Sequence, residues 1–290
     1  MTPIVERLAI VGVGLIGGSF ALALKEAGAV GSVIGAGRSD ENLREALANG
    51  ALDDATTDVV EAVKDADVVL LAVPVRSMAG IAKKIAYTLK SGCIVTDAGS
   101  TKEVVAGELF AHLPPHVKVV PAHPIAGSER TGAAAARADL FVGRRTIITR
   151  NGIADDDAVD IVKRLWEAAG AKVEFMDAHA HDLVLGAVSH LPHMVAYALV
   201  DAVSRWDDET PMLRFSAGGL RDFTRVAGSS PEMWADICID NKDALLEAMT
   251  RYSASLDAVR RLIEKGDAEA LRKFFADARE IRKRIVGAGP

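Results

Sequence analysis

A glycine-rich turn near the start of the chain constrains the fold more than any other feature. Leu8–Val11 is an apolar run, and Gly12, Gly14 and Gly17 follow it with G-x-G-x-x-G spacing before a second apolar stretch. A buried strand, a glycine turn and a helix start in this order indicate a dinucleotide-binding fold. Gly12 permits a tight turn, Gly14 lets the backbone approach a pyrophosphate, and Gly17 allows the helix to pack closely on the strand.

The first turn of the following helix completes the expected cofactor site. A helix N-terminus presents free N–H groups and the positive end of its dipole to an anion. We therefore expect Leu15 and Ile16 to bind the phosphates together with the three glycines.

The residues after the second strand bear on the choice of dinucleotide. That strand, residues 32–36, ends where an acidic side chain binds the adenine ribose of NAD in many such folds. Here Arg38 and Ser39 come before the first carboxylate, Asp40. Because arginine binds phosphate bidentately, this pair suits a 2′-phosphate, and we favour NADP. Stacking of Arg38 on adenine, with NAD as the cofactor, stays open.

Length and composition exclude several classes of protein. The chain has 290 residues, of which 50% are apolar and 26% charged, so it folds as one large soluble domain or two. A net charge of −6 gives no basic surface for nucleic acid. The longest apolar run, residues 66–74, is too short to span a membrane. Cys93 and Cys238 have no metal-ligand spacing, so we expect no metal. We expect no secretory leader either, and a cytoplasmic protein.

Strand and helix patterns alternate in the first part of the chain. This alternation predicts an α/β fold of Rossmann type, with a parallel sheet covered by helices on both faces. Helical stretches are expected at residues 42–48 and 77–89. The expected strands are Leu8–Val11, Ser32–Gly35, Val68–Val73, Cys93–Thr96, Val117–Pro121, Thr146–Thr149 and Lys172–Phe175.

After Asp177 the pattern is helical only. Residues 179–206 are apolar on nearly every face, and two further helices are expected at 231–263 and 267–285. We place a dinucleotide-binding domain at 1–177 and an all-helical substrate and dimerisation domain at 178–290. A helix that is apolar all round is buried inside a domain or between subunits, so we expect a homodimer.

Two loops at the predicted ligand edge carry candidate catalytic residues. Ser100 follows the fourth of the alternating strands; Ser100 and Glu103 also match the S-x-x-E capping box, so a helix cap is an equal alternative. His123 follows the fifth strand and is held by Pro124. Imidazole titrates near neutrality and can accept a proton from an alcohol as hydride leaves, so we favour His123 as a catalytic base. Four other histidines are interpreted as structural or solvated: His112, His116, His179 and His181.

The helical part adds further polar candidates. Pro192 removes a backbone donor inside the long helix and bends it near Val188, which makes room for the flanking histidines His190 and His193. Further along, Arg221, Asp222 and Arg225 leave one guanidinium available for an anion, or form a surface ion-pair ladder.

Five segments together resemble the prephenate/arogenate (cyclohexadienyl) dehydrogenase family of tyrosine biosynthesis. The resemblance runs in order from the first strand to about Asn241 and looks like the short form of the family, without a fused chorismate mutase or regulatory module. The segments are Gly12–Gly18, Asp97–Lys102, His123–Glu129, Ser189–His193 and Asp222–Arg225.

The resemblance implies oxidative decarboxylation. Hydride passes from the ring carbon that bears the 4-hydroxyl to the nicotinamide, and the ring carboxylate leaves as CO2 to give 4-hydroxyphenylpyruvate or tyrosine. His123 would accept a hydrogen bond from the hydroxyl, and Ser100 would hold the hydroxyl or His123. Arg225 would bind a substrate carboxylate, with His190 and Ser128 in the same pocket. The choice between prephenate and arogenate stays open, and tyrosine is expected to inhibit, if it does so, at the active site.

Three alternatives remain. Another Rossmann reductase, of the β-hydroxyacid dehydrogenase or imine reductase type, would need a lysine base on the long helix, and residues 177–205 contain none. A non-catalytic NADP sensor would lose nothing when His123 is replaced. A purely structural helical dimer would leave the polar clusters at the ligand edge unexplained.

Overall fold

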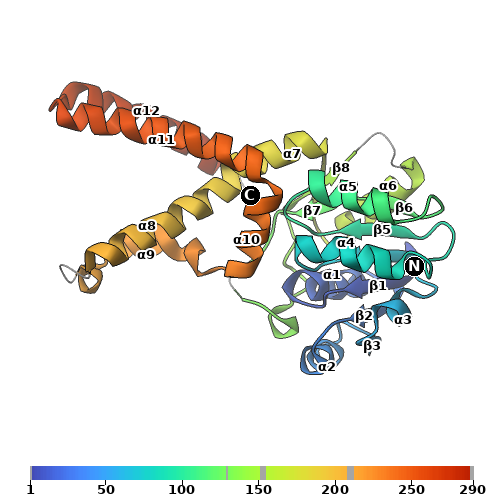
Figure 1. Ribbon diagram of the computed structural model, residues 1–290. Helices are drawn as coiled ribbons and strands as arrows, with labels where there is room; N and C mark the ends of the chain where they lie inside the picture. Colours follow the sequence, from blue (N-terminus) through green and yellow to red (C-terminus); the bar gives the residue numbers. More distant parts are fainter. Residues whose placement is uncertain (1, 129, 151–154, 208–211, 288–290) are drawn as a thin grey trace.

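The first part of the chain forms a six-stranded sheet, which Figure 1 shows on the side of the molecule that carries the N-terminus. The computed structural model describes residues 2–128, 130–150, 155–207 and 212–287. All strands of this sheet are parallel, in the order β3-β2-β1-β4-β5-β6. Sheets with this order bind ligands where it reverses, beyond the carboxyl ends of β1 and β4. The strands are β1 (Val5–Val11), β2 (Val30–Ala36), β3 (Asp54–Thr56), β4 (Val68–Leu71), β5 (Ile94–Asp97) and β6 (Lys118–Val120).

Helices cover both faces of the sheet, which confirms the expected α/β fold. One buried cluster joins one face to α1, α2 and α6 through Phe20, Leu43 and Trp166. A second cluster joins the other face to α3, α4 and α5 through residues such as Met78 and Leu109. The helices are α1 (Leu15–Glu26), α2 (Asp40–Ala48), α3 (Val59–Val63), α4 (Val75–Ile85), α5 (Glu103–His112) and α6 (Asp156–Ala168).

A second, three-stranded sheet corrects the expectation of a single parallel one. It consists of β7 (Ala122–Pro124), β8 (Arg145–Thr149) and β9 (Lys172–Met176). β7 is antiparallel to β8, which is parallel to β9. The strand expected at 117–121 divides at Pro121, because proline has no N–H to donate to the first sheet, and its carbonyl accepts from Thr149 N (3.0 Å) instead. His123 therefore lies inside β7, opposite Ile147, and not after a parallel strand.

The described chain is helical from Ala178 onward. The departure from regular helix that Pro192 predicts near Val188 takes the form of a π-helical segment, Gly186–His190, in the middle of a continuous helix. The single helix expected at 231–263 is wrong: it divides at Asn241, whose side chain bonds to other elements. The helices are α7 (Ala178–Leu185), α8 (Leu191–Asp207), α9 (Gly218–Thr224), α10 (Pro231–Asp240), α11 (Lys242–Glu264) and α12 (Ala268–Gly287).

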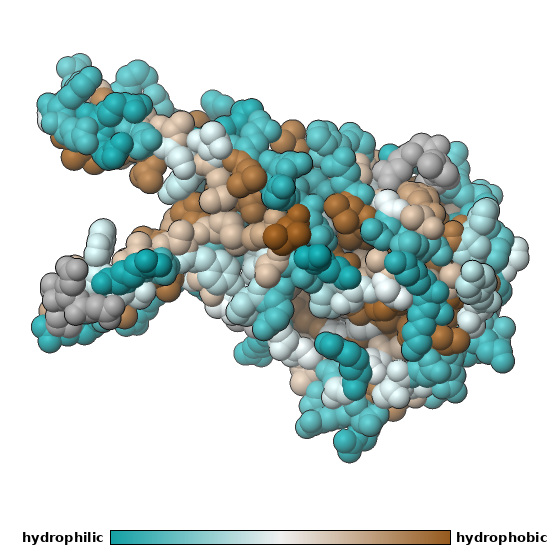
Figure 2. All heavy atoms as spheres, in the orientation of Figure 1, coloured by the Kyte–Doolittle hydropathy of each residue, from teal (hydrophilic) through white to brown (hydrophobic). Residues whose placement is uncertain are grey.

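Much of the apolar surface of the helical part is exposed in the single chain. Ala178–Asp207 is long and apolar enough to cross a membrane by length and composition, and only 22% of its most apolar window is buried. Val188 and Leu256 are 68% and 57% exposed. In Figure 1 the pair α8–α9 and the pair α11–α12 project from the body as two arms, and Figure 2 shows apolar residues along both. An exposed apolar surface of this extent marks an interface.

Candidate functional site

The glycine turn has the geometry that a pyrophosphate requires. Gly12 has a φ of +95°, and a Cβ there would overlap the carbonyl of Ala72. A Cβ on Gly17 would overlap the carbonyl of Gly12, so the helix packs directly on the turn. Gly14 is the N-cap of α1 and makes no side-chain cap, and a Cβ built on it meets nothing within 4 Å. The first N–H groups of α1, at Leu15 and beyond, thus face an open approach that fits a dinucleotide.

Arg38 and Ser39 lie beyond the end of β2, on the same side as the turn. Both are exposed, and Ser39 is the N-cap of α2, where its Oγ accepts from Asn42 N (3.2 Å). The hydroxyl proton of Ser39 can still be donated to a ligand.

A buried ion pair lies beneath the catalytic edge. Lys102 and Asp97 are both fully buried, and the Lys102 ammonium bonds to the Asp97 carboxylate and to Ala122 O (2.9 Å). Asp97 also accepts from Gly99 N (2.8 Å) and Ala122 N (3.2 Å). Burial lowers the pKa of Lys102, although Asp97 opposes the shift. The pair fixes both backbone groups of the residue that precedes His123.

The N-terminus of α5 is capped by a residue from α7. Asp182 accepts from Lys102 N and Glu103 N, both at 2.8 Å, with one carboxylate oxygen each. The alternative interpretation of Ser100 and Glu103 as a capping box is therefore excluded: the N-cap residue of α5, Lys102, makes no side-chain cap, and the carboxylate of Asp182 accepts from the first N–H groups. Ser100 is half-buried next to this helix start. Asp182 thereby joins the two parts of the molecule.

Asp182, His181 and His123 form a hydrogen-bonded series. His181 Nδ1 lies 2.7 Å from Asp182 Oδ1, and His181 Nε2 lies 2.9 Å from His123 Nδ1. Burial opposes ionisation of Asp182, but hydrogen bonds from His181, Glu103 N and Lys102 N outweigh it and lower its pKa. The ionised carboxylate can only accept, so the proton of a neutral His181 is on Nδ1 and its Nε2 accepts from His123 Nδ1.

This series leaves His123 Nε2 with a free lone pair. Within the described part of the chain, no hydrogen-bond partner of Nε2 is found, and the side chain is partly exposed. Burial of the ring, followed by the charges of His181, Lys102 and His190, lowers the pKa of His123 well below 6.5. His123 is therefore a neutral hydrogen-bond acceptor at pH 7.

A second polar cluster continues into the helical part. Asn241 Nδ2 donates to Asp182 O (2.8 Å) and to His190 Nδ1 (3.0 Å). The proton of His190 is therefore on Nε2, a buried donor that has no partner among the described residues. Burial lowers the pKa of His190 to about 4. Trp234 packs edge-on against His190 and stacks on His193 at 3.8 Å between ring centroids.

The remaining predicted site residues lie at the rim. Arg225 is exposed, and its charge adds to burial in lowering the pKa of His193, which places it beside the second cluster. Ser128 is exposed in the segment after His123, where its Oγ accepts from Arg130 N (3.2 Å). His123, Ser100, His190 and Arg225 thus adjoin one row of polar groups, whereas Ser128 stands apart from it.

The sequence analysis did not predict the buried residues that connect these candidates. His181 was expected to be structural or solvated; it is fully buried and bonded to His123, which excludes the solvated alternative and gives it a place in the site that was not expected. The roles of Asp182, Lys102 and Asn241 were not anticipated either. A signal was present, since a His-Asp pair on an otherwise apolar helix must find buried partners.

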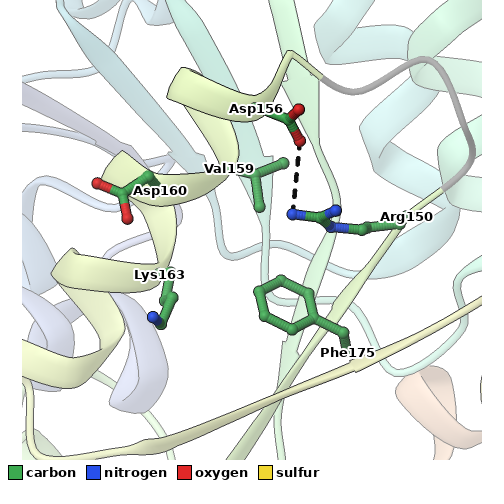
Figure 3. A pocket seen from close by; sticks show the side chains of 6 residues that line it. All are labelled: Arg150, Asp156, Val159, Asp160, Lys163 and Phe175. Atoms are coloured by element: carbon green, nitrogen blue, oxygen red, sulfur yellow. Dashed lines mark ion pairs between the residues drawn. The ribbon is translucent and has the colours of Figure 1, made fainter.

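Two hollows lie outside the row. The one in Figure 3 lies between α6 and β9, where Arg150 pairs with Asp156 (3.5 Å) and stacks on Phe175. Lys163, which also lines it, pairs with Glu167 on the same helix (3.7 Å). A smaller hollow beside the segment after His123 is lined by Arg137 and Arg144. No cluster of metal-ligating side chains is found within the described ranges.

The parallel sheet, the uncapped helix start after the glycine turn and the neighbouring polar row define a dinucleotide-dependent dehydrogenase with a helical second domain. The family model described as "Prephenate dehydrogenase, nucleotide-binding domain" matches residues 20–175, and "Prephenate dehydrogenase, dimerization domain" matches 177–277. The chain therefore belongs to the prephenate dehydrogenase family.

Individual relatives agree with this assignment. The chain is 38% identical to the cyclohexadienyl dehydrogenase of Zymomonas mobilis over 96% of its length and 95% of the relative's. It is 36% identical to the prephenate dehydrogenase of Bacillus subtilis, covering 97% of this chain and 76% of that one. The crystal structure of Aquifex aeolicus prephenate dehydrogenase with hydroxyphenyl propionate and NAD+ superimposes with a TM-score of 0.91 at 36% identity, covering 97% and 98% of the two chains.

Proposed function

We propose that this protein oxidatively decarboxylates prephenate, arogenate or both in tyrosine biosynthesis, with hydride transfer to a nicotinamide dinucleotide. The observation that carries the proposal is the series from Asp182 through His181 to His123, which presents a neutral imidazole acceptor at the cofactor edge. The relatives named above are prephenate and cyclohexadienyl dehydrogenases, and they support this substrate class.

The residues of the chain would serve the reaction as follows. His123 Nε2 accepts a hydrogen bond from the 4-hydroxyl, which raises the electron density on that oxygen as hydride leaves its carbon. A nicotinamide dinucleotide held by the glycine turn would supply the acceptor for that hydride. The electrons of the breaking bond between ring carbon and carboxylate complete the aromatic ring, CO2 departs, and the hydroxyl proton stays with the phenol. His181 and Asp182 orient His123 and keep Nε2 unprotonated, and Ser100 holds the hydroxyl or the imidazole.

We propose that the second cluster and its rim bind the substrate. Arg225 would bind a carboxylate, since a guanidinium matches that group bidentately. The buried Nε2–H of His190 needs an acceptor oxygen, which a substrate can supply. Ser128 would reach the substrate from the segment after His123.

NADP is the cofactor that we propose in preference to NAD. Arg38 and Ser39 are exposed at the ribose end of the site, with positive charge and a hydroxyl to offer a 2′-phosphate. Replacement Arg38→Asp should shift the ratio of kcat/KM values from NADP towards NAD. An unchanged ratio would show that Arg38 only stacks on adenine.

The deciding experiment is an initial-rate assay of the purified protein with prephenate and with arogenate, each with NADP and with NAD. Turnover in any combination supports the proposal and ranks substrate and cofactor. No turnover in all four, while a dinucleotide still binds, would contradict it. Added tyrosine tests inhibition: since tyrosine is the aromatic product of arogenate and keeps its alanyl side chain and 4-hydroxyl, we propose that it competes for the same site.

We also propose a cytoplasmic homodimer with its domain boundary after Asp177. Asp177 caps α7 by accepting from Ala180 N (2.8 Å), so it begins the helical part. The exposed apolar arms and the dimerization-domain match support the dimer.

A further inference from the structure

A side chain from α2 reaches the glycine turn between β1 and α1. Asn42 Nδ2 donates to Val13 O at 2.5 Å, and Val13 stands between Gly12 and Gly14. The Val13 carbonyl carries a partial negative charge, and Asn42 is the donor that satisfies it. The hydrogen bond holds that oxygen against α2.

The other end of the same amide is also occupied. Asn42 Oδ1 accepts from Ala133 N at 2.7 Å, and Ala133 is fully buried. A carbonyl can only accept and an N–H can only donate, so the two contacts fix the orientation of the amide. Asn49, the C-cap residue of α2 seven positions further on, donates to Ala133 O (2.9 Å) but makes no hydrogen bond to the turn.

Ala133 belongs to the long connection between β7 and β8, which begins directly after His123 and Pro124. The connection also packs on α1: Arg137 N donates to Ser19 Oγ (2.9 Å), and a Cβ on Gly18 would lie 2.8 Å from Ala136 Cβ. The connection is therefore anchored to α1 and to α2, the two helices that contact the glycine turn. Asn42 is the side chain that bonds both to that turn and to the connection.

We propose that Asn42 is a positioning residue for dinucleotide binding. Its amide holds the Gly12–Gly14 turn in the conformation that receives the pyrophosphate, and it ties that turn to the connection that follows the catalytic histidine. The inference rests on dinucleotide binding alone and does not require the proposed substrate.

The variant Asn42→Asp separates the two contacts. A carboxylate can still accept from Ala133 N, so the connection stays anchored, but it cannot donate to Val13 O and repels it. Calorimetric titration with ADP-ribose, which has the pyrophosphate without the nicotinamide, should show at least tenfold weaker binding, as expected for loss of a hydrogen bond in an organised loop plus an added charge. NADP and NAD should lose affinity by a similar factor.

Asn49→Asp is the matched control, because it adds the same charge at the C-terminal end of α2 and removes a hydrogen bond to the connection, at Ala133 O, without touching the turn. Asn42→Ala, checked for folding by circular dichroism, should weaken ADP-ribose binding by about tenfold without any added charge. Unchanged affinity in both Asn42 variants would overturn the proposal, and so would an equal loss in Asn49→Asp. Because no substrate is present, failure here leaves the proposed reaction untouched, and absence of turnover would leave this inference untouched.

Discussion

At the scale of single residues, the tautomer of His123 decides what the site can do. An imidazole held by a carboxylate through a second imidazole has a defined acceptor nitrogen, and that nitrogen lies next to the cofactor edge. His123→Asn should lower kcat by two to four orders of magnitude while the Kd for NADP stays within a few-fold, because a general base is lost and the turn is not altered. His112→Asn, on the surface of α5, is the control, and a near-normal rate in His123→Asn would remove the base assignment.

The pKa of His123 gives the same assignment a pH dependence. The pKa lies below 6.5, and only the neutral imidazole can accept the hydrogen bond from the substrate hydroxyl. The rate should therefore hold constant as pH falls to 6.5 and decline only at lower pH, in a profile of kcat/KM for the substrate. Asp182→Asn replaces the carboxylate at the end of the series with a neutral amide, and it should lower kcat at every pH in this range. A midpoint at or above 6.5 in the unaltered protein would contradict the lowered pKa.

The lowered pKa of His190 makes the stability of the folded protein depend on pH in the same range. His190 stays neutral in the folded protein down to about pH 4, whereas the unfolded chain takes up a proton below 6.5. Unfolding thus binds a proton in this window, so the free energy of unfolding falls as pH falls from 6.5 to 4, by about 3 kcal/mol for this one group. Urea titrations of His190→Asn, whose Oδ1 can still accept from Asn241, should show a shallower decline. An identical slope would refute this contribution.

At the scale of elements, the N-terminus of α5 allows a test of whether Ser100 acts in catalysis or as a helix cap. Since Asp182 caps this helix, Asp182→Ala should cost at least about 1 kcal/mol of unfolding free energy, the usual value for a lost cap. Ser100→Ala should cost less than about 0.5 kcal/mol, because it removes no cap, yet should lower kcat. Urea unfolding and initial rates of both variants check this. Loss of stability without loss of rate in Ser100→Ala would restore the capping interpretation.

Sequence patterns predicted the elements whose signal lies in one continuous segment. β1, the glycine turn and α1 follow from an apolar run, glycine spacing and a second apolar stretch along Val5–Glu26, and they form as expected. The divisions at Pro121 and Asn241 could not be found this way. Pro121 has its partner in another sheet, and Asn241 is held by His190 and by Asp182 O. The same reason explains why His123 was found but its partner His181 was not: one follows a strand in a motif, and the other acquires its role only by tertiary contact.

At the scale of the whole molecule, the two exposed apolar arms favour the proposed homodimer. Met249, Leu256 and Ile263 recur at seven-residue spacing on α11 and are 41%, 57% and 62% exposed. Leu256→Asp should convert the dimer to a monomer at micromolar concentration, as seen by sedimentation velocity, since a charge buried at such a seam has no partner. Ser255→Asp adds the same charge beside it on the helix and should stay dimeric. A dimeric Leu256→Asp protein would exclude this stripe from the interface.

Asp182 makes the two halves poor candidates for exchange as modules. A fragment ending at residue 177 would keep the glycine turn but would leave the backbone of Lys102 and Glu103 without its acceptor and His123 without its neighbour. In a chimera joined at that point, the His123 imidazole is oriented correctly only if the helix that replaces α7 carries a His-Asp pair at the positions of His181 and Asp182. Recombination therefore has to transfer Asp182, His181 and His123 together. A junction at residue 177 separates these side chains and disturbs the site.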